Sequence, residues 1–150
     1  MRNAIFKALQ LIASILNEDI DVKTIFSIEA DELDQNKKDY FPMVNILLNA
    51  IDFTENTVSF EITYLDIRDK SKILISDKFQ GNDNRWDNWV QAHSIMQNLV
   101  NKLKNQRHDD DLTYISSTEP QIVSDAFGNG LDGLIMTVTI FYPSNKTTIC

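Results

Sequence analysis

Two histidines and a run of aspartates are the residues of this 150-residue chain whose side chains could do chemistry. His93 falls among apolar residues with helical spacing, where an imidazole is more often packed than used for proton transfer. His108 precedes the run 109–111, and carboxylates in series could attract Ca²⁺ or Mg²⁺. Their spacing matches no calcium loop, however, and a solvated helix exit accounts for the same residues. We therefore predict no catalytic histidine and no metal site.

The glycines and the cysteine indicate no cofactor either. Residues 125–133 (DAFGNGLDG) precede a strand pattern, whereas a dinucleotide site needs a helix N-terminus after its glycines. The sequence has no GxxxxGK[ST] motif, and no Ser or Cys lies in a nucleophile-elbow context. The single cysteine, Cys150, cannot form an internal disulfide or a zinc site. The prediction is a protein that is not an enzyme and needs no cofactor.

Composition favours one globular domain, with 43% hydrophobic and 24% charged residues. We expect this domain to span residues 1–143, with a flexible tail at 144–150. The net charge of −8 disfavours binding to nucleic-acid phosphates and to anionic membranes.

Residues 1–16 begin with a positively charged residue and continue with a run of mostly apolar residues. Lys7, Gln10 and Ser14 interrupt the run, so we expect an amphipathic helix rather than a signal peptide or a membrane span.

Two segments show helical spacing of apolar residues, at 3–16 and 82–105. The first helix has a second apolar stripe beside its main one, made of Ala4, Ala8, Leu11 and Ile15. The apolar stripe of the long helix consists of Trp86, Trp89, Val90, His93, Met96, Leu99, Val100 and Leu103, which leaves Ile95 on the far side. A single sheet covers only one face of a helix. The remaining apolar positions therefore need cover from the rest of the chain or from a second subunit.

Alternation of apolar and polar residues predicts strands at 22–28, 43–50, 57–67, 112–116, 121–124 and 134–142. Residues 52–56 (DFTEN) are typical of a hairpin turn, and residues 31–39 of an exposed loop. Residues 73–79 could form a further short strand or an extended arm. This order predicts an α+β fold, with an antiparallel or mixed sheet of about four to six strands. An N-terminal helix and one long helix would cover one face of the sheet.

The order of these segments resembles that of tail-terminator and head–tail connector (neck ring) proteins of tailed bacteriophages. The similarity extends over about residues 1–142 and rests on architecture. Its parts are NAIFKALQLIASIL, FPMVNILL, TVSFEITYLDI, the loop ISDKFQGNDN, the helix WVQAHSIMQNLVNKL and the final DAFGNGLDGLIMTVTIFYP. The last segment resembles a pattern of an acidic residue, a Gly-rich turn and a strand that alternates apolar residues with Thr. The Asn-, Asp-, Ile- and Lys-rich composition also resembles that of crAss-like phages.

This resemblance implies a structural virion protein that is made in the host cytoplasm and forms a homo-oligomeric ring at the phage neck or tail top. Its partners would be copies of itself and neighbouring portal, connector or tail proteins. DNA would pass through the ring without sequence-specific binding, and no membrane would be involved. The alternative is a small acidic immunity or adaptor protein that binds a basic protein partner.

Candidate interface residues follow from both the resemblance and the leftover apolar positions. Trp86 and Trp89 could either cap the core or anchor an interface, where Trp is enriched. The full set is Ala4, Ala8, Leu11, Ile15, Ile73, Ile75, Phe79, Trp86, Trp89 and Ile95.

Overall fold

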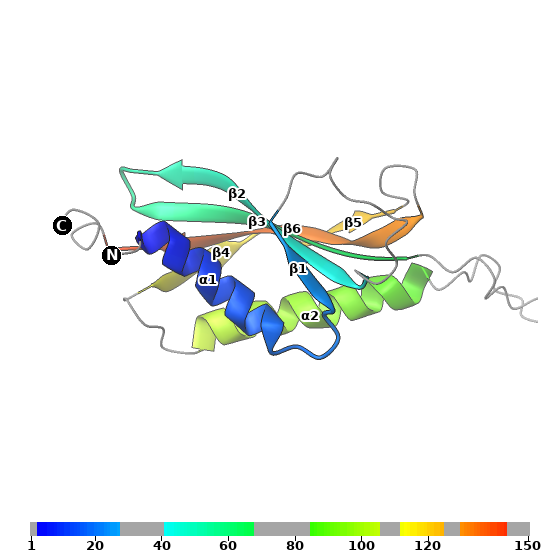
Figure 1. Cartoon of the computed structure of the whole chain (residues 1–150). Helices are drawn as coiled ribbons and strands as arrows, with labels where there is room; N and C mark the ends of the chain where they lie inside the picture. Colours follow the sequence, from blue (N-terminus) through cyan, green and yellow to red (C-terminus); the bar gives the residue numbers. More distant parts are fainter. Residues whose placement is uncertain (1–2, 28–40, 68–84, 106–111, 125–129, 144–150) are drawn as a thin grey trace, which may run out of the picture.

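The computed structural model describes residues 3–27, 41–67, 85–105, 112–124 and 130–143. Within these ranges, two helices pack against a six-stranded mixed sheet (Figure 1). The elements are α1 (Ala4–Asn17), β1 (Thr24–Phe26), β2 (Met43–Asp52), β3 (Thr57–Ile67), α2 (Arg85–Asn105), β4 (Thr113–Ser117), β5 (Gln121–Val123) and β6 (Leu131–Phe141). The predicted α+β class is confirmed.

The sheet has the strand order β1-β2-β3-β6-β4, and β5 pairs with β6 further along the same strand. β1 runs parallel to β2, and every other described pair is antiparallel. The predicted hairpin between β2 and β3 is confirmed. In its turn, Asp52 Oδ1 accepts hydrogen bonds from the backbone N–H groups of Thr54 and Glu55, and Asn56 adopts φ 54°.

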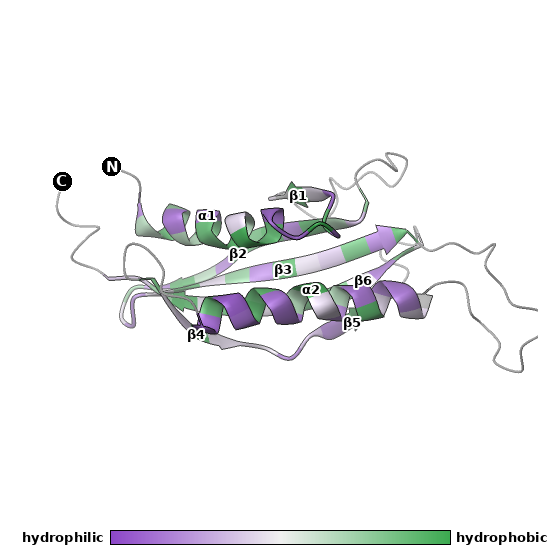
Figure 2. Ribbon diagram, turned by 90° about the horizontal axis from the view of Figure 1, so that it is seen from below, coloured by the Kyte–Doolittle hydropathy of each residue, from purple (hydrophilic) through white to green (hydrophobic). Residues whose placement is uncertain are grey.

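The two faces of the sheet differ in what covers them. Along β3, Val58, Phe60, Ile62 and Tyr64 are buried and join one core with the buried residues of both helices. The side chains between them are half-buried and polar. Both helices therefore cover the same face, and Figure 2 shows hydrophilic and hydrophobic residues alternating along α2. No helix among the described residues is long and apolar enough to cross a membrane.

Of the two alternatives for the second apolar stripe of α1, cover from the rest of the chain is the one that the structure has. Ala4, Ala8 and Ile15 are buried, and Leu11 is half-buried against the same core. The reason is that α1 contacts both α2 and β1, so two of its sides are covered within one chain. The helix begins after Asn3, whose side-chain oxygen accepts the Ile5 N–H at 2.7 Å.

The buried side of α2 also differs from the predicted stripe. Asn88, Ala92 and Ile95 are buried, whereas Val90 and His93 are exposed. Contact with α1 as well as with the sheet turns this helix relative to the expected orientation. Ile95, expected on the far side, therefore belongs to the core.

Strand boundaries differ from the expectation at β1, which spans Thr24–Phe26 instead of beginning at residue 22, and at β6. This strand begins at Leu131, so the predicted loop at 125–133 ends earlier, and Gly133 lies within the sheet opposite Leu65. Gly130, just before the strand, has φ 70°. The predictions for residues 31–39, 73–79, 82–84, 108–111 and 144–150 lie outside the described residues.

Candidate interaction surfaces

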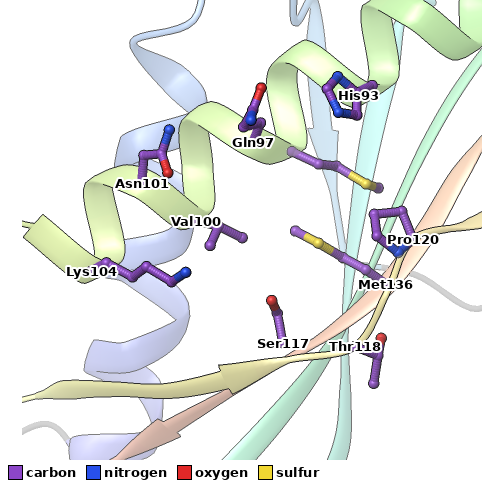
Figure 3. Close-up of a pocket in the computed structure, with 10 residues that line it drawn as sticks. His93, Gln97, Val100, Asn101, Lys104, Ser117, Thr118, Pro120 and Met136 are labelled. Atoms are coloured by element: carbon purple, nitrogen blue, oxygen red, sulfur yellow. The ribbon is translucent and has the colours of Figure 1, made fainter.

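A groove of about 270 Å³ lies between α2 and the connection from β4 to β5 (Figure 3). Figure 3 shows the side chains of α2 on one side and Ser117, Thr118 and Pro120 on the other. The groove is lined by His93, Met96, Gln97, Val100, Asn101, Lys104, Ser117, Thr118, Pro120 and Met136. Its floor is apolar and its rim is polar, which is a composition that suits either a ligand or simple packing.

The hydrogen bonds in this groove favour packing. The Tyr114 hydroxyl donates to Ser117 Oγ at 2.9 Å. The backbone N–H of Thr137 donates to Thr118 Oγ1 at 2.9 Å, and the Thr118 N–H donates back to the Thr137 carbonyl. The Lys104 ammonium lies 5.6 Å from the centroid of the Tyr114 ring. These contacts tie β4 and its following turn to β6 and α2.

The described lining of the groove does not assemble an acid–base pair. His93 is exposed, and neither a carboxylate nor a thiol is among the ten lining residues. General acid–base catalysis needs a second group within hydrogen-bond reach of the reacting atom or of the imidazole. The groove therefore offers no arrangement of described residues that would use His93 for proton transfer.

Two carboxylates lie side by side in the described part of the sheet. Asp66 and Asp132 are directly opposite each other on β3 and β6, and Asp132 is fully buried. Burial raises the pKa of Asp66, while the Ile67 N–H bond to its Oδ1 at 2.8 Å acts in the opposite direction. Within the described ranges, no three His, Cys, Asp or Glu residues come together to hold a metal ion. Residues 108–111, which the sequence suggested for a cation, lie outside these ranges.

Tyr64 lies two positions along β3 from Asp66, under the helices. Its hydroxyl is buried and has no hydrogen-bond partner among the described residues. Burial raises the pKa of this phenol above its usual range, and the negative charges of Asp66, Asp21 and Asp19 add to the effect. The group is therefore neutral at physiological pH and acts as part of the core.

The first turns of α2 are attached to the end of the sheet by two side chains. Asn88 Nδ2 donates to the Ile67 carbonyl, and Trp89 Nε1 donates to the Val123 carbonyl, each at 3.2 Å. The rings of Trp86 and Trp89 meet edge to face, with centroids 5.6 Å apart. Trp89 is half-buried, whereas Trp86 is 56% exposed. Of the two, Trp86 has the surface that an interface would use.

One exposed apolar surface lies at the β2–β3 hairpin. Leu48 and Ile51 are on the face of the sheet that carries the helices, since they pair with Phe60 and Val58. Leu48 is nevertheless 52% exposed, and Phe53 in the turn is 81% exposed. We call Leu48, Ile51 and Phe53 the hairpin surface.

Two separate apolar residues are exposed at the opposite edge of the sheet, one in β4 and one in β5. Ile115 in β4 is 51% exposed, and Ile122 in β5 is also exposed. β6 pairs with β3 along one of its edges, and β4 and β5 both pair with its other edge. We call Ile115 and Ile122 the β4–β5 surface.

The structure separates the sequence-derived interface candidates into three groups. Ala4, Ala8, Ile15 and Ile95 are buried within the chain, so they offer no surface to a partner. Leu11 and Trp89 are half-buried, and Trp86 is exposed. Ile73, Ile75 and Phe79 lie outside the described residues.

The hairpin surface and the β4–β5 surface were both missed from the sequence. Leu48 and Ile51 resemble core positions, because their exposure depends on which strand ends the sheet. Phe53 carried a signal, since it is an aromatic residue in a polar turn.

Comparison with known proteins adds no assignment. No family model matches this chain, and no curated protein is similar enough to it for a relationship to be drawn.

Proposed function

We propose that this chain is a structural subunit that assembles with copies of itself into a ring, and that the ring belongs to the neck or tail top of a phage virion. The observation that carries the proposal is the position of its exposed apolar residues. The hairpin surface and the β4–β5 surface lie towards opposite edges of one sheet. Apolar side chains left in water at two separate places favour contacts with other chains.

Two different surfaces at opposite edges of the sheet suit a head-to-tail contact between subunits. In such a contact, one surface of each subunit meets the other surface of the next. Repeating the contact gives a closed ring when the rotation between subunits closes, and an open filament when it does not. A two-fold dimer, by contrast, would need one surface that complements itself.

The position in a phage virion is supported by the order of the elements and by the charge. An N-terminal helix, a β-hairpin, a long helix and a final strand that alternates apolar residues with Thr follow the order of tail-terminator and connector proteins. A ring of subunits that each carry a net charge of −8 would repel DNA phosphates. DNA would then pass through without being held. Portal, connector or tail proteins would be the neighbours.

The experiment is a measurement of mass against concentration. Light scattering after gel filtration, followed by electron microscopy of the largest species, should show a closed oligomer with an axial opening that admits duplex DNA. A strict monomer at every concentration would contradict the proposal. A monomer that binds one basic protein tightly would instead favour the acidic adaptor.

A further inference from the structure

We infer that the hairpin turn of one subunit binds in the groove of the next: the Phe53 ring of one copy enters the space between α2 and the β4–β5 connection of its neighbour. This inference rests on the proposed self-assembly and names the contact that would produce it. The occupant of the groove is a second copy of this chain.

The groove has the size and the lining that suit an aromatic ring. Its volume is about 270 Å³, and an apolar cavity of about 150 Å³ inside a protein can hold a benzene molecule. Met96 and Met136 line the groove and are buried, and Figure 3 shows the Met136 side chain extending from the sheet towards α2. Thioether groups make favourable contacts with aromatic rings and adapt to their shape.

One wall of the groove is fixed before anything binds. Thr118 exchanges two hydrogen bonds with Thr137, and Ser117 Oγ accepts one from the Tyr114 hydroxyl. These bonds hold the β4–β5 connection on the sheet. A site that is already formed loses less conformational freedom on binding than one that must first be ordered.

Phe53 is the aromatic side chain that this chain offers to such a groove. Among the described aromatic side chains it is the most exposed, at 81%. It lies in the β2–β3 turn, where Asp52 Oδ1 accepts two backbone N–H groups and Asn56 adopts φ 54°. An exposed ring on an ordered turn can be buried at little further cost in conformational entropy.

Phe53 cannot fill the groove of its own chain. The hairpin begins beyond the row in which Thr57 pairs with Phe141, whereas Met136 in the groove pairs with Ile62. These two rows are five residues apart, from 57 to 62 on β3, which is about 17 Å along the strands. The ring in the groove must therefore come from another copy.

The charges of the turn and the groove are complementary. Lys104 is exposed at the rim of the groove, and none of the ten described lining residues is a carboxylate. The turn carries Asp52 and Glu55, both of them exposed. On a chain with a net charge of −8, a surface that has a cation and lacks a carboxylate is one that an acidic turn can approach without repulsion.

The contact uses the tip of the hairpin and leaves the pairing of the sheet unchanged. β1 stays paired with residues 43–45 of β2, and β5 stays paired with residues 133–135 of β6. Tip and groove are different parts of the subunit. Each copy can therefore place its tip in one neighbour while its own groove receives the tip of another, which is the head-to-tail relationship of a ring.

Cysteine cross-linking tests this pairing. In a Cys150→Ser background, Thr54→Cys places a thiol beside Phe53 and Asn101→Cys places one on the rim of the groove, both at exposed positions. The double variant should form a ladder of disulfide-linked multimers under mild oxidation. Pairing Thr54→Cys with Gln10→Cys, on the exposed side of α1, is the matched control and should form no ladder. A product that stops at dimers would overturn the head-to-tail contact.

Two substitutions measure what the ring and the charge contribute. Phe53→Ala should raise the concentration needed for assembly by about ten- to a hundredfold, because a buried aromatic side chain is lost from each contact. Lys104→Glu should weaken assembly more than Lys23→Glu, which makes the same change of charge at an exposed position outside the groove. Equal losses for the two lysine variants would overturn the inference.

The outcomes separate this contact from the proposed ring. A stable oligomer that forms no ladder and assembles equally well with Phe53→Ala would overturn the inference and leave the ring standing. A chain that stays monomeric at all concentrations would overturn both.

Discussion

The carbonyl group of Tyr64 occupies the space in which a side chain on Gly133 would begin. A Cβ built on Gly133 overlaps the carbonyl oxygen of Tyr64, and it lies 2.6 Å from the carbonyl carbon and 3.2 Å from the Cα of Leu65. All three atoms belong to the backbone of β3, so relief would need the central strand pair to separate. The glycine is required here because two backbones come close together.

We expect Gly133→Ala to destabilise the domain by roughly 1–3 kcal/mol or more, the range for forcing extra atoms into a packed site. Urea unfolding followed by circular dichroism measures the change. Thr137→Ala, on the same strand but half-buried, should stay within about 1 kcal/mol of the parent. Equal stability of Gly133→Ala and the parent would contradict the close approach.

Removing the hydroxyl of Tyr64 should not weaken the fold. It is buried without a partner among the described residues, so it has lost its water and gained no hydrogen bond there. We expect Tyr64→Phe to leave the free energy of unfolding unchanged or raise it by about 1–3 kcal/mol, the usual penalty of such a group. Tyr64→Ala should instead lower it by about 3–5 kcal/mol, because the ring fills the core. A clear loss on Tyr64→Phe would mean that the hydroxyl has a partner.

The carboxyl of Asp66 predicts a pH dependence. Burial raises its folded-state pKa, so ionisation is less favourable in the folded chain than in the unfolded one. Stability from this group is complete below the unfolded pKa, near 4, and falls as pH rises towards the folded value. Asp66→Asn should therefore stabilise the domain at pH 7 and have little effect at pH 3, since the amide oxygen can still accept the Ile67 N–H.

Urea unfolding of Asp66→Asn at both pH values measures this difference. Glu119→Gln, at an exposed position, removes the same formal charge and corrects for the general relief of a net charge of −8. An equal gain at pH 3 and pH 7 would show that the burial of Asp66 is not its cause.

Charge placed on either the hairpin surface or the β4–β5 surface should weaken assembly without unfolding the subunit. Leu48→Asp and Ile115→Asp each alter an exposed side chain, so monomer stability should change by less than about 1 kcal/mol. Each variant keeps the other of these two surfaces intact. Analytical ultracentrifugation should show monomers for either variant alone and a one-to-one dimer for their mixture.

Ile20→Asp is the control for this experiment, because Ile20 is 96% exposed and lies in neither apolar surface. It should assemble like the parent chain. Failure of the mixed variants to associate would contradict a head-to-tail contact through these two surfaces.

The strands were more predictable than the faces of the helices. The predicted bounds of β3 are correct at both ends. The side chains on one face of this strand are buried and those on the other are less so, which gives a clear alternation of apolar and polar residues in the sequence. The side of α2 that is buried depends on α1, which is distant in sequence. With α1 packed against α2, Ile95 is buried and Val90 is exposed. Because both are aliphatic residues of similar size, the local sequence does not indicate which of them is buried.

The candidate surfaces were less predictable for a related reason. Leu48 lies opposite Phe60 and has the residue type of a core position. It is exposed in the part of β2 with which β1 does not pair. The length and placement of β1 are not encoded by the local sequence around Leu48.

The position of the hairpin surface and the β4–β5 surface at opposite edges of one sheet has a consequence for how assembly would proceed in time. In a growing row of subunits, each addition makes one contact and immobilises one more molecule. The last contact joins the two ends of the same row, so it forms without further loss of translational freedom. Complete rings and free subunits should therefore dominate at equilibrium, and partial rows should remain scarce.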